Sequence, residues 1–252
     1  MRLVLSLLML LQLPAPHLRN DVDGHLRRFK NVVARQARAF PQSFFLEGQS
    51  EDKAIALTFD DGPDPIYTDQ ILDILDKNDV KATFFMVGAK MRHWPDVARR
   101  IERAGHATGG HGYEHIDLAK LRPGAAVREQ LEPTQKAFGD VLGHPMRLFR
   151  PPYGALTDGE IALFAKSGLT IIDWSVDSFD WKVGADGAER IRRTVMRYVH
   201  PGAIVLLHTG GGNRGATARA LPALVAELRA QGYRFVTVPE LLRLDKPAQE
   251  TE

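Results

Sequence analysis

The sequence predicts an α/β fold, an incomplete (β/α) barrel of about seven parallel strands. Short apolar runs typical of strands alternate about seven times with amphipathic stretches, and this alternation predicts parallel strands joined by right-handed crossovers. Polar side chains follow five of these runs at their C-terminal ends. An open sheet collects its site at one switch point, whereas the strand ends of a barrel converge on one mouth. Seven strands would leave that barrel incomplete.

Six amphipathic stretches supply the helices that this alternation needs. The predicted strands are residues 54–59, 82–87, 106–109, 147–149, 169–174, 203–207 and 234–238. The predicted helices are residues 68–78, 95–105, 123–139, 156–168, 186–199 and 216–232. Pro95 and Gly105 stand where one helix begins and ends, since proline favours the first turn and glycine the position past the last. Pro133 lies inside its stretch and predicts a kink or break there.

Composition excludes several classes of site and partner. The 252 residues are 44% hydrophobic and 25% charged, which are ordinary values for a globular chain with a sizeable core. The formal net charge of +2 gives no indication of a nucleic-acid partner. The sequence contains no cysteine, which excludes disulfides, thiolate metal sites and cysteine nucleophiles.

The first residues indicate a signal for export. Arg2 precedes an apolar run from Leu3 to Leu13, which is shorter than the roughly 20 residues of a membrane span and is stopped by Pro14. Residues 1–16 are therefore predicted to be a signal peptide or an N-terminal anchor. The predicted location is the periplasm or the cell envelope. If the apolar segment packs on the protein instead, a cytoplasmic location is the alternative.

Residues 17–50 are predicted to be an amphipathic helical extension. Their apolar residues recur at three- and four-residue steps, and basic residues occupy the other positions. Such a helix either packs on the domain with a solvated basic face or lies on an anionic membrane surface as a peripheral contact. The main domain is predicted to span residues 51–245, followed by a polar tail at 246–252. No pattern predicts the oligomeric state.

Two histidines four residues apart are candidates for a metal site. His111 and His115 lie in GGHGYEH, where the glycines favour a loop that lets backbone approach a ligand. Adding one carboxylate gives the three-ligand shell of a catalytic zinc-type site, with a position left for water. Histidines also serve as ordinary surface or capping groups, and the pair by itself leaves that alternative open.

Asp60 and Asp61 place two carboxylates at the end of the first predicted strand. One can be a metal ligand, and the other can act as a base on a water in the same site. Neighbouring side chains of a regular strand point to opposite faces, so both acids reach one site only if the chain bends. Gly62 and Pro63 predict that bend. A helix cap is the structural alternative for either acid.

Three further strand ends carry side chains that suit the same site. Arg150 is a permanent cation that can hold an aspartate in place and keep it ionised. Asp177 and Asp180 both follow the fifth predicted strand, and Trp181 beside them suits stacking on a sugar ring, although core packing is commoner for tryptophan. His208 follows a buried strand and, beside an acid such as Asp180, can be tuned as a general acid.

Five short motifs occur in a recognisable order along the main domain. They are TFDDGP, GHATGGHGYEH, FRPPYG, DSFDW and LLH, and the stretch VKATFFMVG accompanies them. Together they resemble the NodB-like polysaccharide deacetylases, carbohydrate esterase family 4. The resemblance covers about residues 52–243. It implies a distorted, incomplete (β/α) barrel and metal-dependent removal of N-acetyl groups from amino sugars.

The resemblance implies roles in proton transfer for four residues. Asp60 resembles the catalytic base, and Arg150 resembles the group that orients it. His208 resembles the catalytic acid, and Asp180 resembles its partner.

The resemblance also implies a metal site and a substrate site. One divalent ion is implied, zinc first, with cobalt, nickel or manganese as alternatives. Its implied ligands are Asp61, His111 and His115. The backbone N–H of Tyr153 resembles an oxyanion donor. Trp181 and Leu206 resemble the apolar walls that receive the acetyl methyl.

Two positions depart from the family pattern. The family usually has serine or threonine directly after the first metal histidine, where the hydroxyl braces the loop, and this chain has Gly112. Many members have aspartate after the histidine of the last motif, and this chain has Thr209. A looser loop predicts that Gly112→Ser tightens metal binding, unless Gly112 needs a positive φ that serine resists.

The predicted function is metal-dependent deacetylation of N-acetylated amino sugars in a polysaccharide or oligosaccharide that is peptidoglycan-, chitin- or poly-N-acetylglucosamine-like. The enzyme would be a hydrolase of carbon–nitrogen bonds other than peptide bonds, with a carbohydrate substrate. Deacylation of another sugar, an O-acetyl xylan or an N-formyl lipid-linked sugar, is the alternative among enzymes. A catalytically silent sugar-binding module is the alternative outside them, and the complete set of ligands, base and acid argues against it.

Overall fold

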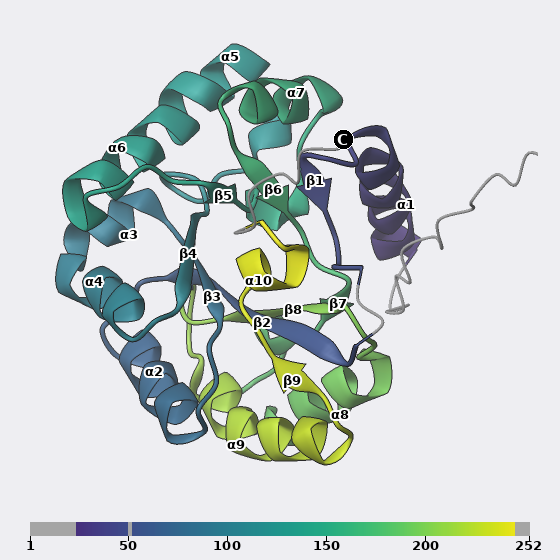
Figure 1. Ribbon diagram of the computed structural model, residues 1–252. Coiled ribbons are helices and arrows are strands. Elements are labelled where there is room, and N and C mark those ends of the chain that lie inside the picture. Colours follow the sequence, from purple (N-terminus) through teal and green to yellow (C-terminus); the bar gives the residue numbers. More distant parts are fainter. Residues whose placement is uncertain (1–23, 50–51, 245–252) are drawn as a thin grey trace, which may run out of the picture.

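A curled sheet of parallel strands, surrounded by helices, forms the centre of the protein (Figure 1). The computed structural model describes residues 24–49 and 52–244. The strands are β1 (Phe44–Phe45), β2 (Ala54–Gly62), β3 (Thr83–Met86), β4 (Ala107–Gly110), β5 (Leu148–Phe149), β6 (Thr170–Ile172), β7 (Val176–Asp177), β8 (Ile204–His208) and β9 (Arg234–Phe235). The helices are α1 (Gly24–Ala39), α2 (Tyr67–Lys77), α3 (Gly88–His93), α4 (Pro95–Arg103), α5 (Pro123–Ala125), α6 (Glu132–Leu142), α7 (Asp158–Lys166), α8 (Ala188–Tyr198), α9 (Gly215–Ala230) and α10 (Val238–Leu242).

The order of the strands makes an incomplete barrel, which confirms the predicted fold class. Eight strands follow one another as β1-β6-β5-β4-β3-β2-β8-β7, and β9 lies off this path. All pairings between these strands are parallel. Among the described residues, the end strands β1 and β7 are not paired with each other. The segment that follows β1 extends to the start of β8. There Glu47 forms an isolated β-bridge with Ala203, and Gly48 N donates to Gly202 O at 2.8 Å.

Two strands of the structure, β1 and β7, are absent from the sequence prediction because they are very short. β1 and β7 have two residues each, too few to produce a recognisable period-two pattern. Asp177 therefore lies within a strand, although the sequence placed it after one. The last predicted strand, 234–238, contains only β9, and α10 already begins at Val238. β9 pairs with the first residues of β2, far from the site.

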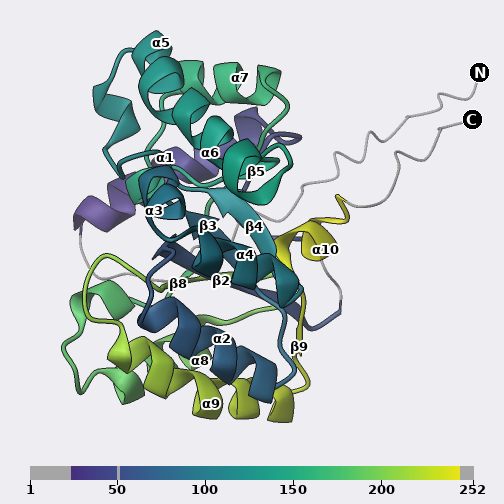
Figure 2. The ribbon, with the colours of Figure 1, turned by 90° about the vertical axis from the view of Figure 1, so that its left-hand side faces the viewer.

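The central strand β2 carries the first two candidate acids into the interior. All nine of its residues are buried, and it lies between β3 and β8. Burial on both faces explains why its sequence is a continuous apolar run before Asp60. Figure 2 shows α2, α8 and α9 on one side of these strands and α5, α6 and α7 on the other. α10 packs near the N-terminal strand ends, where Val238 N donates to Thr83 Oγ1 at 2.9 Å, so the opposite ends carry the site.

The N-terminal helix packs on the body of the protein. Within the predicted extension, residues 24–39 form α1, residues 44–45 form β1, and Val33 is buried against the core. Gln36 Nε2 donates to Leu156 O at 2.7 Å, and both terminal nitrogens of Arg35 contact Asp158 at 2.8 Å. The predicted signal peptide and the C-terminal tail lie outside the described residues. The domain boundary at residue 51 stays a prediction, although β1 joins the sheet.

No helix among the described residues is long and apolar enough to cross a membrane.

The helical stretch that contains Pro133 is irregular, as the sequence predicts. A π-helical segment, Ala126–Leu131, precedes α6, and Pro133 falls in the first turn of α6. Leu131 and Glu132 keep right-handed helical backbone, so the π-helical segment continues directly into α6, and Pro133 removes one backbone donor at this junction.

Candidate active site

An extra residue in β2 turns both acids toward one site. Asp60 pairs with Phe85 and Gly62 pairs with Met86, so Asp61 is a bulge between them. Its backbone is left-handed, with φ of 69°, a conformation that aspartate tolerates better than most residues. The predicted bend at Gly62 and Pro63 therefore begins one residue earlier, at Asp61 itself.

The structure brings Asp61, His111 and His115 together at the ends of β2 and β4. One ligand atom of each lies within 4.8 Å of those of the other two. Asp61 Oδ1 lies 3.0 Å from His115 Nε2 and 3.5 Å from His111 Nε2. This oxygen is buried and makes no hydrogen bond of suitable geometry, so it retains the capacity to bind a cation.

The second nitrogen of His111 fixes the orientation of its ring. His111 Nδ1 lies 2.8 Å from the carbonyl oxygen of Arg150, and because a carbonyl only accepts, Nδ1 is the donor. In the neutral ring, this leaves Nε2, the nitrogen that faces Asp61, as the atom with a free lone pair. Backbone carbonyls orient metal-binding histidines in this way. The donor set and the unbonded oxygen of Asp61 fit a divalent ion with nitrogen and oxygen ligands.

The buried guanidinium of Arg150 fixes the position of the Asp60 carboxylate. Arg150 is fully buried, and its Nη1 donates to Asp60 Oδ1 and to Thr58 Oγ1, both at 2.8 Å. Its guanidinium lies over the Phe85 ring, 4.1 Å from the ring centre. The nearby side chain of Asp173 has no hydrogen-bond partner in the described structure, and burial raises its pKa well above the usual value. This shift disfavours the charged form of Asp173, whose charge would otherwise compete with Asp60 for Arg150.

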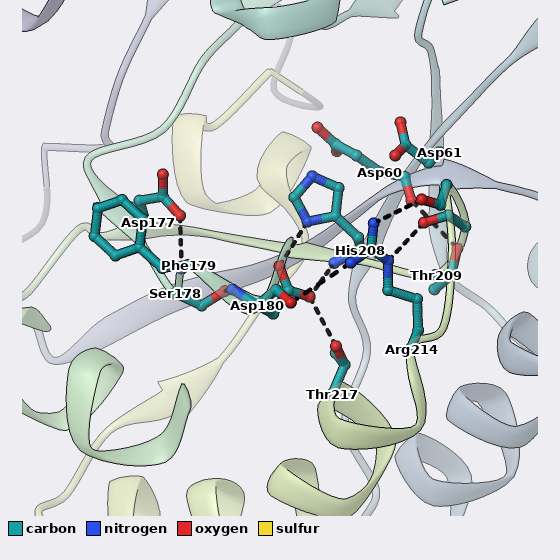
Figure 3. A network of polar contacts seen from close by, with 12 residues as sticks. Asp60, Asp61, Asp177, Ser178, Phe179, Asp180, His208, Thr209, Arg214 and Thr217 are labelled. Atoms are coloured by element: carbon teal, nitrogen blue, oxygen red, sulfur yellow. Dashed lines mark hydrogen bonds and ion pairs between the residues drawn. The ribbon is translucent and has the colours of Figure 1, made fainter. Parts of the chain in front are cut away.

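Asp180 and His208 form a pair on the other side of the site (Figure 3). His208 Nδ1 contacts Asp180 Oδ1 at 2.6 Å, and Asp180 Oδ2 accepts hydrogen bonds from His208 N at 2.9 Å and Thr217 Oγ1 at 2.8 Å. Burial lowers the pKa of His208. The charge of Asp180 and its hydrogen bond, with the charges of Asp61 and Asp60, outweigh this and raise the pKa to about 9. His208 is therefore protonated at neutral pH.

The sheet places the two sides next to each other. Asp60 and His208 are direct neighbours in the parallel pairing of β2 and β8. Thr209 N donates to the Asp60 carbonyl at 2.9 Å, so Thr209 extends this pairing. Past it, Gly211 passes so close to Asp61 that a Cβ on it would lie 2.3 Å from Asp61 Oδ2. Arg214 Nη2 donates to the Gly211 carbonyl at 3.2 Å.

Comparison with known proteins identifies the family. Residues 47–172 match the polysaccharide deacetylase family model. A peptidoglycan-N-acetylglucosamine deacetylase of Bacillus cereus is 35% identical over 205 residues, 81% of this chain and 74% of that protein. This chain belongs to the polysaccharide deacetylase family. The recognition made from its motifs is confirmed, and so is the predicted class of enzyme, a hydrolase of carbon–nitrogen bonds other than peptide bonds.

Solved structures of polysaccharide deacetylases share the fold. A crystal structure of a peptidoglycan N-acetylglucosamine deacetylase, in complex with an N-oxidanyl-benzamide, has a TM-score of 0.78 at 34% identity, covering 82% of this chain and 96% of that one. A second neighbour is a CE4 family pseudoenzyme from Bacillus anthracis. Its TM-score is 0.73 at 32% identity, covering 79% of this chain and 69% of that one.

The three residues predicted to bind substrate in this deacetylase have different exposures. Tyr153 is 60% exposed, has a left-handed backbone with φ of 61°, and packs its ring edge-on to His115 at 4.9 Å. Trp181 is 44% exposed, and Lys182 Nζ lies 4.6 Å from its ring centre. Leu206 is buried in β8, beside Thr58 and Asp177 in the sheet.

Several residues of the site have no counterpart in the sequence prediction. Gln130, Thr217 and Arg214 contact the loops and acids of the site, and Lys90 Nζ donates to the Asp61 carbonyl at 2.7 Å. The predicted candidates lie in strands or in the loops that follow them, whereas Lys90, Gln130 and Thr217 come from helices. Their polar character at otherwise buried helical positions, clearest for Gln130 and Thr217, was the one signal that could have found them.

The expectation for Gly112 is resolved by its backbone. Gly112 has a backbone φ of 72°, which residues other than glycine, asparagine and aspartate rarely adopt. A Cβ there would also lie 3.2 Å from Pro152 Cγ. Of the two expectations for Gly112→Ser, the structure favours strain over tighter metal binding.

Proposed function

We propose that this polysaccharide deacetylase removes N-acetyl groups from amino sugars of an envelope polysaccharide or its fragments, in a metal-dependent reaction. One observation carries the proposal. A buried carboxylate oxygen that has no hydrogen bond of suitable geometry faces two histidines. Beside it lies an aspartate held by a buried arginine, and a protonated histidine lies on the neighbouring strand. This set combines a cation site, a base and an acid, which are the groups that metal-assisted hydrolysis of an amide uses.

Asp61, His111 and His115 would hold one divalent ion. Zinc is the first choice for two histidines and a carboxylate, and cobalt, nickel or manganese are alternatives whose use depends on availability. When bound, such an ion polarises the acyl carbonyl and lowers the pKa of a water beside it.

Asp60 and His208 divide the transfer of protons. Asp60 accepts a proton from the attacking water. At the same time, the water oxygen bonds to the acyl carbon. Arg150 keeps Asp60 oriented, since Nη1 occupies only Oδ1. His208 donates a proton to the amine nitrogen as the carbon–nitrogen bond breaks, which yields acetate and a free amino sugar. Asp180 keeps His208 protonated until that step.

Substrate contacts are proposed for the exposed rim and for one buried wall. The rings of Tyr153 and Trp181 are accessible for stacking on sugar. Leu206, with Trp181, would receive the acetyl methyl. The backbone N–H of Tyr153 would donate to the developing oxyanion.

Two other functions remain to be separated by experiment. A different acyl group, such as O-acetyl on xylan or N-formyl on a lipid-linked sugar, would use the same groups. A catalytically silent sugar-binding module is the other alternative, and one structural neighbour is a pseudoenzyme of the CE4 family. The described site retains the three candidate ligands as a cluster and carries the base and the acid on neighbouring strands, which supports turnover.

The test is mass spectrometry of N-acetylglucosamine oligomers incubated with the protein and a divalent ion. We expect loss of acetyl mass, which a chelator abolishes and added zinc restores. O-acetyl xylan is the parallel substrate, and Asp60→Asn is the matched inactive control. Binding of oligomers without loss of acetyl would favour the silent module, and turnover of xylan alone would favour the ester alternative.

The cellular setting follows from the same proposal. A peptidoglycan-like substrate lies outside the cytoplasmic membrane, which supports the predicted export. A peripheral membrane contact through the N-terminal helix stays a prediction, and Arg35 already pairs with Asp158.

A further inference from the structure

The loop that carries both histidine ligands lacks a side-chain brace of its own. Between His111 and His115 the chain contains Gly112, and both Gly112 and His115 have left-handed backbones, with φ of 72° and 57°. Two left-handed residues so close together give the loop a conformation that local sequence does not strongly favour. Contacts from outside the loop must therefore fix it.

Gln130 supplies a contact from the interior. Its Oε1 accepts hydrogen bonds from Tyr113 N at 2.9 Å and from Glu114 N at 3.0 Å. Gln130 is 1% exposed, so water cannot readily replace this acceptor. The two amides belong to the residues directly before His115. One oxygen atom thus fixes the backbone between the two ligands.

The local structure around Gln130 is an unusual helical turn. Gln130 lies in the π-helical segment Ala126–Leu131, and its own carbonyl accepts from Thr134 Oγ1 at 2.6 Å. A π-helical turn redirects side chains relative to a regular α-helix and often occurs at functional sites. The start of α3 holds the other edge of the loop, where Gly88 N donates to the Gly112 carbonyl at 2.9 Å.

We propose that Gln130 is a positioning residue that sets the geometry of the His111–His115 loop for metal binding. It does so through two backbone amides and without touching the ion. This inference rests on the proposed metal site.

The test compares two substitutions of similar length. Gln130→Met removes the acceptor, and Gln130→Glu keeps an acceptor oxygen in the same position. We expect the zinc Kd, measured by competition with a chelator at fixed pH, to rise roughly 10–100-fold in Gln130→Met, a size typical of groups that orient metal ligands. Gln130→Glu should stay near the wild type. Amide hydrogen exchange at Tyr113 and Glu114 should speed up only in Gln130→Met.

Gln36→Met is the matched control for loss of a buried glutamine. Gln36 is 2% exposed and bonds to Leu156 O, away from the metal loop. It should lower thermal stability and leave the zinc Kd unchanged. If Gln130→Met does not fold, Gln130→Asn serves instead, because its amide is one methylene too short to reach both N–H groups.

The outcomes separate this inference from the proposed function. A wild-type protein that binds no zinc overturns the metal site and, with it, the role of Gln130. A wild type that binds zinc, with an equal Kd in Gln130→Met or Gln130→Asn, overturns the positioning role alone.

Discussion

The metal side of the site, formed by Asp61, His111 and His115, and the proton-donor side, formed by Asp180 and His208, differ in how their carboxylates are bonded. Both oxygens of Asp180 are used, Oδ1 by His208 Nδ1 and Oδ2 by His208 N and Thr217 Oγ1. Asp61 Oδ1 has no hydrogen bond of suitable geometry. A fully bonded carboxylate tunes its neighbour, whereas an under-bonded one has capacity for a ligand. Remaining acceptor capacity therefore distinguishes the two roles.

The two sides also differ in what fixes their position. On the metal side, left-handed residues and amides bonded to Gln130 make the backbone itself the critical element. On the proton-donor side, the side chain of Asp180 is the critical element, because it bonds both to His208 in β8 and to Thr217 in α9. Damage to the metal side should therefore appear in metal affinity, and damage to the proton-donor side in pH dependence.

The largest expected effects come from replacing each of the two adjacent acids, Asp60 and Asp61, with asparagine. Asp61→Asn should lose the ion, because the amide replaces the charged oxygen that faces both histidines. Asp60→Asn should keep the ion and lose turnover, since removal of a general base typically costs about 10²–10⁴-fold. Metal content and kcat are measured on the same preparations. An Asp60→Asn protein without metal, beside an active Asp61→Asn protein, would reverse the assignment.

The next effect concerns the pH profile. The pKa of His208 is raised to about 9, so its proton is present at neutral pH and is lost as the pH rises through that value. Activity should therefore fall on the alkaline side. Asp180→Asn removes the strongest charge that raises this pKa, so the alkaline limb of kcat/KM should move to lower pH. His208→Ala should abolish or shift the limb.

The control for this prediction is the zinc Kd, which Asp180→Asn should leave nearly unchanged. The limb is a macroscopic quantity because the charges of Asp60 and Asp61 act on the same group. An alkaline limb that keeps its position in Asp180→Asn would assign it to a group other than His208.

A smaller effect is expected from Gly112→Ser on the metal side. A residue with a Cβ at φ of 72° is disfavoured by about 1–2 kcal/mol, and the contact with Pro152 adds to this. We expect a lower Tm and weaker zinc binding. Gly112→Asn is the matched variant, because asparagine tolerates left-handed backbone better, and it should cost less. Tighter zinc binding by Gly112→Ser would restore the hydroxyl-brace expectation.

The smallest effect is expected from Thr217→Val on the proton-donor side. The change preserves shape and removes one of the three hydrogen bonds to the Asp180 carboxylate. One hydrogen bond contributes about 0.5–1.5 kcal/mol, so kcat/KM should fall about two- to tenfold with zinc affinity unchanged. A fall in zinc affinity instead would show that the two sides are not independent.

The sequence predicts the chemical groups of the site better than the contacts that fix them. Asp60, Asp61, His111, Arg150 and His208 could be found because parallel strands carry their polar residues to one edge. Whether they perform the predicted roles awaits the experiments above. The bulge at Asp61 could not be found, because Gly62 and Pro63 are the stronger local signal for a bend.

The remaining contacts depend on tertiary packing. Gln130 and Thr217 contact the site from helices, and nothing in a helical pattern says which loop a polar side chain will meet. The strands β1 and β7 are set by pairing with β6 and β8, and two residues carry no periodic pattern of their own.

The pairing of Asp60 with His208 in adjacent strands has a consequence for engineering acyl selectivity. The spacing of their backbones is the hydrogen-bonded spacing of a sheet, about 4.8 Å, and no side-chain substitution can widen it. Attempts to make the enzyme accept longer acyl chains should leave these strands alone. They should instead enlarge the region around Leu206 and Trp181 and retain the two proton-transfer groups at their native separation.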